Sequence, residues 1–269
     1  MYYHPNGIGL GDAADYLAGI HNLVTTGTVW YVDSESGADA ASPQGLSPEY
    51  PLATLDRAVT NATADDTVVL MSTHDETITA NVFISKRLTI VGLGSSAGVP
   101  LAKLTNNVSG AGSISCTVPV HWRNIRFPED GASAAQNKLS LAAGCRMTGC
   151  LVERGDNDPA GQGAIIAAIV GSGIQLVDCV FKSTGTDPTT PPYMIVMATA
   201  AQTDLLIQRC TFDAGITGFS GTYGLSISAA GTGVVLEDLT LNGADCFVHA
   251  SSTGRYNVTS STGHSKVVW

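Results

Sequence analysis

The sequence predicts an all-β protein, a right-handed parallel β-helix solenoid with short N-terminal capping helices. Three observations predict this fold. A six-residue pattern recurs every 25 to 31 residues, each recurrence contains a second apolar segment, and helical periodicity is confined to two short stretches near the N-terminus. A chain with such a period stacks coils, and each coil buries its apolar face only against its neighbours.

The recurring pattern begins and ends with an apolar residue and has Cys or an aliphatic residue at its fourth position. Its copies are residues 122–127, 147–152, 176–181, 207–212 and 236–241. Three copies have cysteine at the fourth position: Cys150, Cys179 and Cys210. Stacked coils place these cysteines in one buried column. We interpret them as small core residues rather than as a metal or redox site.

A second apolar segment accompanies each copy of the pattern. The segments are residues 139–141, 165–170, 194–197, 225–227 and 247–248. Two or three short strands in a coil of 25 to 31 residues suit a parallel β-helix, whereas a β-propeller blade needs about 40 residues.

The chain divides into an N-terminal arm (1–29) and a β-helix domain (30–269), in which a first module (30–71) precedes the coils (72–269). Residues 12–24 predict a short amphipathic helix within the arm. The apolar residues of the arm are Tyr2, Tyr3, Leu17, Ile20, Leu23 and Val24. They are our candidate interaction site, and they either fold onto their own chain or dock onto another subunit.

Within the first module, residues 30–32 and 67–71 predict strands and residues 53–61 predict a second helix. A helix laid across the open end of a solenoid covers unpaired strand edges, which otherwise promote aggregation.

The composition argues against two classes of function. The formal net charge is −10 and no basic cluster stands out, which argues against nucleic-acid binding. No apolar run approaches the roughly 18 residues of a membrane span, and the N-terminus lacks the features of a secretory signal. We therefore expect no membrane partner and a chain that folds in the cytoplasm.

Acidic residues gather in the segments that follow the pattern, where coil length varies. This acidic ridge contains Glu129, Asp130, Glu153, Asp156, Asp158, Asp187, Asp213 and Asp245. Glycosidases need two carboxylates held about 5–10 Å apart. The ridge offers few basic partners, however, so we expect solvated loop acids.

The sequence shows no catalytic or metal-binding signature. Its six histidines have no paired ligand spacing, and no Ser-His-Asp or Cys-His arrangement is present. We expect no cofactor and no metal, and we expect that the chain is not an enzyme. Asp178, Arg209 and Asp238 share one position of the pattern and predict a surface charge ladder.

Residues 30–39 and 45–59 resemble the first module of pectate-lyase-like β-helix proteins. The continuation through 65–70, 74–78 and 88–94 is similar to a version common among virion proteins of tailed phages. This resemblance implies trimeric tailspikes and fibres, or decoration proteins of the capsid surface. Tailspikes usually carry a head-binding domain before the β-helix, where this chain has only a short arm.

We therefore expect a structural phage virion protein, most simply a homotrimeric capsid decoration protein that contacts the major capsid protein or other virion subunits. Its location would be the virion, after assembly in the host cytoplasm. The alternative is a tailspike or receptor-binding protein that binds or cleaves glycan on the acidic ridge.

Overall fold

The computed structural model describes thirteen segments of the chain. They are residues 27–40, 44–106, 113–128, 139–154, 166–168, 173–183, 195–197, 204–213, 223–227, 233–242, 245–248, 254–260 and 267–268. The predicted helix at 12–24 and all six candidate interaction residues, Tyr2 to Val24, lie outside these segments.

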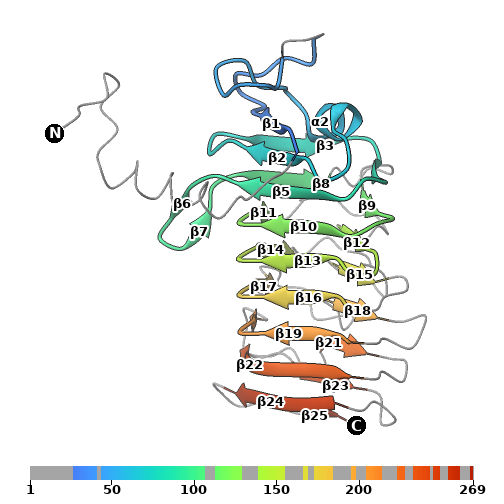
Figure 1. Cartoon of the computed structure of the whole chain (residues 1–269). Coiled ribbons are helices and arrows are strands. Elements are labelled where there is room, and N and C mark those ends of the chain that lie inside the picture. Colours follow the sequence, from blue (N-terminus) through green and yellow to red (C-terminus); the bar gives the residue numbers. More distant parts are fainter. Residues whose placement is uncertain are drawn as a thin grey trace, which may run out of the picture.

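The described residues form a parallel β-helix, which confirms the predicted fold (Figure 1). Three columns of strands run along its axis. The first column contains β1 (Val29–Val32), β2 (Thr67–Leu70), β5 (Leu88–Gly92), β10 (Val120–Arg123), β13 (Arg146–Thr148), β16 (Gln175–Val177), β19 (Leu206–Gln208) and the first halves of β22 (Val234–Asn242) and β24 (Gly254–Ser260).

The other two columns complete each coil. The second contains β3 (Asp75–Ile78), β8 (Lys103–Asn106), β11 (Arg126–Phe127), β14 (Leu151–Arg154), β17 (Val180–Ser183), β20 (Thr211–Asp213) and the second halves of β22 and β24. The third contains β4 (Val82–Ile84), β9 (Ile114–Cys116), β12 (Leu139–Leu141), β15 (Ile166–Ala168), β18 (Ile195–Met197), β21 (Tyr223–Ile227), β23 (Asp245–Val248) and β25 (Val267–Val268). A small hairpin, β6 (Ser95–Ser96) and β7 (Val99–Pro100), projects from the stack.

The repeated pattern forms the corner between the first and second columns. Its first residue points inward from the first column, and its last points inward from the second. Its fourth residue is buried at the corner itself, as Ile125, Cys150 and Cys179 show. This corner explains why the pattern needs apolar residues at three positions and tolerates variation at the others.

The third residue of each copy turns the corner through a left-handed backbone conformation. The φ angles are 51° at Asn124, 63° at Gly149, 55° at Asp178, 50° at Arg209 and 52° at Asp238. Gly, Asn and Asp tolerate this region best, which accounts for four of the five residues. The amide of Asn124 donates to the Thr148 carbonyl at 2.9 Å, and equivalent bonds continue along the next coils.

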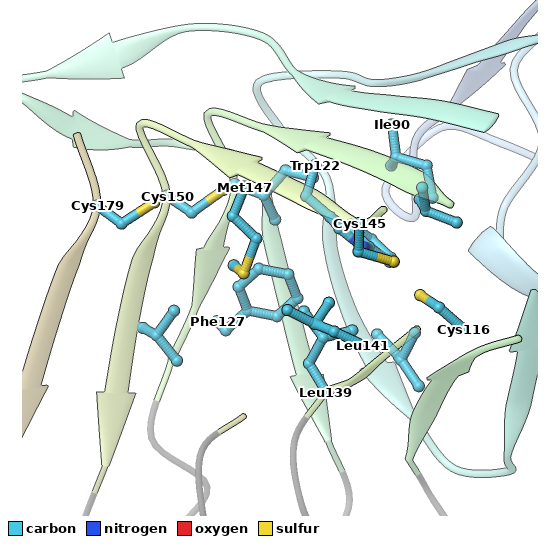
Figure 2. Packing of buried hydrophobic residues seen from close by; sticks show 14 of the residues in the cluster. Ile90, Cys116, Trp122, Phe127, Leu139, Leu141, Cys145, Met147, Cys150 and Cys179 are labelled. Carbon is cyan, nitrogen blue, oxygen red and sulfur yellow. The ribbon is translucent and has the colours of Figure 1, made fainter. Parts of the chain in front are cut away.

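The core is a continuous apolar column inside the coils. Figure 2 shows part of it, where Trp122, Met147 and Phe127 pack between the columns. The rings of Phe181 and Phe212 stack with their centroids 5.0 Å apart, because parallel register places them one above the other. Such buried aromatic pairs stabilise the stack beyond their area burial.

Cys150, Cys179 and Cys210 form the predicted buried column of free thiols. Each sulfur lies near a backbone carbonyl, for example 3.3 Å from Cys179 Sγ to the Val177 oxygen. Burial raises the pKa of the Cys150 thiol, so it stays protonated. The column is therefore packing, as the sequence predicted.

The predicted helix at 53–61 is present as α2 (Leu55–Asn61), with Thr54 as its N-cap. The helix contacts β1 and β4, but it does not complete the edge of β1. Residues 44–52 do so instead. The amide of Tyr31 donates to the Gly45 carbonyl at 2.7 Å, and the amide of Leu52 donates to the Tyr31 carbonyl at 2.9 Å. A loop, rather than the helix, thus closes the strand edge that the sequence analysis assigned to the helix.

Candidate functional site

At the N-terminal end of the coil stack, hydrogen-bond networks join a loop, a strand and a helix. Here the loop at 44–52, β1 and α2 cover the first coil. Gly45 is required in the loop because its φ is 86° and a Cβ there would lie 2.8 Å from Leu52 Cγ. A residue with a side chain would therefore be strained at this position of the loop.

Asp66 fastens the chain before β1 to the turn before β2. Its Oδ1 accepts a hydrogen bond from the Thr28 amide at 2.7 Å. Its Oδ2 accepts from Trp30 Nε1 at 3.1 Å, from the Thr63 amide at 2.7 Å and from Thr63 Oγ1 at 3.1 Å. Burial alone would raise the pKa of Asp66, but these hydrogen bonds outweigh it and lower the pKa below its ordinary 3.8.

A second buried network joins β1, β3 and α2. The Ser34 amide donates to His74 Nδ1 at 3.0 Å, so a neutral ring carries its proton on Nε2. That Nε2 lies 3.2 Å from Glu76 Oε2. The same carboxylate oxygen accepts from the Leu55 amide at 2.7 Å, at the first residue of α2. His74 is completely buried, so this network positions the helix rather than reaching a ligand.

Asp33 and Lys86 complete the attachment of the loop and helix. Asp33 accepts from Ser36 Oγ at 2.6 Å and from Thr73 Oγ1 at 3.0 Å. Lys86 Nζ donates to the carbonyls of Val59, Thr60 and Ala62 at 2.7–2.9 Å, at the C-terminal end of α2. A cation at that end also complements the helix dipole. The N-terminal end is thus a rigid, preorganised surface.

Four exposed large apolar side chains belong to the first coils. Among the described residues, the exposed fractions are 49% for Leu46, 61% for Tyr50, 62% for Phe83 and 37% for Leu101. The first two belong to the loop that closes β1, Phe83 belongs to β4 and Leu101 follows the hairpin. Val180 on β17, at 38%, is the exposed large apolar residue elsewhere on the described coils. Sequence analysis missed this set because exposure depends on how the loop folds.

The acidic ridge is only partly within the described residues. Glu129, Asp130, Asp156, Asp158 and Asp187 lie outside them. Glu153 differs from the expectation of a solvated loop acid. It lies on β14, is nearly buried and bonds Arg126 Nε at 2.7 Å. Strand alternation explains its position, because Val152 points inward and Glu153 therefore points outward against its neighbours.

Two further ridge acids belong to strands. Asp213 ends β20 in register with Lys182, and Asp245 begins β23. The alternative of a ridge that binds or cleaves glycan stays a prediction.

The predicted charge ladder is present at the corner. Arg209 donates two hydrogen bonds to Asp178, at 2.6 and 2.8 Å. The Arg209 guanidinium lowers the pKa of Asp178 below its ordinary value. Both side chains are about half exposed, so the pair adds little stability.

No group of three or more His, Cys, Asp or Glu side chains in the described segments is arranged to hold a metal ion. None of the helices in those segments is long and apolar enough to cross a membrane.

Comparison with known proteins places the chain by fold. No protein-family model and no curated protein matches it. Similar solved structures include a rhamnogalacturonan lyase, with a TM-score of 0.45 and 11% identity over 90% of this chain and 62% of that one. They also include the pectin methylesterase from Aspergillus niger, with a TM-score of 0.42 and 12% identity over 89% of this chain and 82% of that one. The chain spans less than two thirds of the lyase.

These comparisons overturn the expectation that the chain is not an enzyme. Both similar structures are named as enzymes, a lyase and a methylesterase, although at this identity the likeness shows the fold alone. The absence of a catalytic motif from the sequence was not sufficient ground for that expectation. Folds of this kind host many functions, and a set of catalytic residues is recognised by its geometry rather than by its spacing along the chain. What the structure and these likenesses share is the fold, a parallel β-helix.

Proposed function

We propose that the chain is a structural component of the surface of a tailed-phage particle, assembled in the host cytoplasm, that decorates or stabilises the capsid. The particle shell, through the major capsid protein or another virion subunit, is its partner. In this proposal the β-helix stands on the shell by its N-terminal end. The resemblance of residues 30–94 to phage virion proteins supports the phage origin.

The observation that carries the proposal is the position of the exposed apolar side chains. Leu46, Tyr50, Phe83 and Leu101 all lie in the first coils. Large apolar groups on a rigid surface mark contact with another protein, because covering them removes apolar area from water. The networks around Asp66 and Glu76 hold this surface in place, so little ordering entropy is lost on docking.

We also propose that the chain forms a homotrimer, as its resemblance to phage virion proteins implies. Three β-helices side by side would present three N-terminal ends to the shell. Light scattering at micromolar concentration tests this part. A trimer supports it, and a monomer contradicts it without affecting the docking end.

The docking role is tested with variants in the phage that encodes the chain. The double variant Leu46→Ser, Tyr50→Ser removes two exposed apolar groups of the loop. Deletion of residues 1–29 removes the arm. We expect both to reduce the copies per purified particle, measured by quantitative mass spectrometry. Loss of an apolar contact lowers affinity, and occupancy follows affinity.

Val180→Thr is the matched control, because it removes an exposed apolar group from a coil far from the N-terminal end. Its occupancy should equal that of the wild type. Circular dichroism melting establishes that each variant folds. Wild-type occupancy in the folded double variant and in the arm deletion would refute docking through this end.

A further inference from the structure

A cationic patch lies on the outer face of the first column, at β10 and β13. In β10 the side chains of Val120 and Trp122 point inward, so His121 and Arg123 point outward. In β13, Met147 is inward, and Arg146 and Thr148 are outward. We call His121, Arg123, Arg146 and Thr148 the β10–β13 patch.

The register of the two strands arranges the patch as a square. His121 is opposite Arg146, and Arg123 is opposite Thr148. Adjacent strands are about 4.8 Å apart, and outward residues of one strand are about 6.6 Å apart. The two arginines therefore occupy one diagonal. His121 and Thr148 occupy the other, where His121 Nε2 lies 3.1 Å from Thr148 Oγ1.

The charge of the patch at neutral pH comes from the two arginines. Burial, together with the nearby Arg146 and Arg123 guanidinium groups, lowers the pKa of His121 to about 4. The imidazole is then neutral and the patch carries two positive charges. The flanking strands add no charge on this face, because their outward residues include Thr89 on β5 and Gln175 on β16.

Neither arginine of the patch has a carboxylate partner among the described residues. Four other outward cations of the described coils do have one. These pairs are Arg87 with Asp65, Lys103 with Asp75, Arg126 with Glu153, and Arg209 with Asp178. Two guanidinium groups that lie close together without a carboxylate among the described residues repel each other, and the chain as a whole carries a net charge of −10. An anion from outside the chain would remove this repulsion.

We propose that the β10–β13 patch binds a phosphate group, either inorganic phosphate or a phosphate monoester on a partner molecule. Arg123 and Arg146 approach it from opposite corners, and their guanidinium forks donate hydrogen bonds to its oxygens. The Thr148 hydroxyl, which can accept from His121, is free to donate its own proton to a third oxygen.

Charge favours phosphate over a carboxylate. A phosphate monoester carries about −1.5 to −2 at neutral pH, which matches two arginines. A carboxylate carries one negative charge and would leave one guanidinium group uncompensated. The site is independent of the particle role proposed above, because it lies on the side of the coils rather than at the N-terminal end.

The test is a titration of inorganic phosphate into the full chain at neutral pH and low ionic strength. The readout is the imidazole resonances of His121 by NMR, assigned with a His121→Gln variant. We expect a saturable shift. We also expect a rise in the His121 pKa when phosphate is bound, because the bound anion stabilises the imidazolium. Arg123→Gln and Arg146→Gln should each weaken binding about tenfold.

The matched control is Lys182→Gln, which makes the same change in net charge on β17, in another face of the coils. It should leave the affinity for phosphate unchanged. Acetate at the same ionic strength tests the carboxylate alternative and should bind at least about tenfold more weakly.

Four results would overturn the proposal. They are a shift of His121 that does not saturate, unchanged affinity in Arg146→Gln, equal weakening in Lys182→Gln, and acetate that binds as tightly as phosphate. If an arginine variant fails to fold, the phosphate-dependent pKa of His121 in the wild-type protein decides the matter, and an unchanged pKa counts against the site.

Discussion

Replacing Asp66 by Asn should loosen the N-terminal end of the β-helix. The carboxylate accepts four hydrogen bonds, from Thr28, Trp30 and twice from Thr63. An Asn side chain oriented to keep the three bonds at Oδ2 turns its NH₂ group toward the Thr28 amide, which is also a donor. One partly buried N–H is then unsatisfied, and the remaining bonds lose their charge assistance.

We expect Asp66→Asn to cost about 2–3 kcal/mol. An unsatisfied, partly buried donor accounts for about 1–2 kcal/mol, and the weaker bonds add about 1 kcal/mol more. Because a solenoid can open from one end while the other coils stay folded, the assay should measure opening of the N-terminal end alone. Hydrogen exchange of the Thr28 and Thr63 amides measures opening of this end. Asp65→Asn is the control, because Asp65 is exposed, has a φ of 70° that Asn tolerates, and should exchange like the wild type.

The pH dependence gives the same prediction a second readout. The folded-state pKa of Asp66 is below its ordinary 3.8, so its contribution to stability is present above 3.8 and is lost as the pH falls through the folded-state pKa. The difference between the wild type and Asp66→Asn should therefore be largest at neutral pH and shrink below about pH 4. Equal exchange rates at neutral pH, or a difference that persists in acid, would refute the reasoning.

Other substitutions test separate parts of the structure. Phe181→Ala should destabilise the coils by about 3–5 kcal/mol in urea unfolding, because Phe181 is fully buried and stacks on Phe212. Arg209→Gly should melt within a few degrees of the wild type, since glycine adopts the left-handed conformation of residue 209 without strain, and this gain offsets the lost ion pair. Arg209→Val should melt lower. Lys86→Met should cost about 1 kcal/mol in the same urea assay, through the uncapped carbonyls of α2. The thiols of Cys150 and Cys179 should resist a thiol reagent until the chain is denatured; fast reaction of the folded protein would contradict their burial.

Much of the architecture could be predicted from the repeated pattern. Its apolar positions depend only on local periodicity, so the stacked coils, their buried apolar face and the cysteine column all followed from spacing. The left-handed backbone conformation of the third residue was not predicted. Asn124, Gly149 and Asp178 could have indicated it, since these residue types tolerate positive φ. Arg209 concealed it, because arginine is uncommon in that region.

The candidate site was less predictable, because it depends on contacts between distant residues. Asp66 and Glu76 read as ordinary turn and strand acids, and only the folded loop shows that they hold β1 and α2. The β10–β13 patch was likewise hidden. His121 and Arg146 are 25 residues apart, and the strand register makes them neighbours. An alignment of the first two copies of the pattern, extended one residue toward the N-terminus, would have placed them together.

The orientation of the β-helix on a phage particle tests the central claim most directly. Cryo-electron microscopy of purified particles, with the subunit structure fitted into surface density, measures it. We predict density for the β-helix on the shell, with the loop at 44–52 and β4 facing the capsid and the coils of β22 and β24 pointing away. Particles without such density, or a β-helix that meets the shell through β24, would contradict the account.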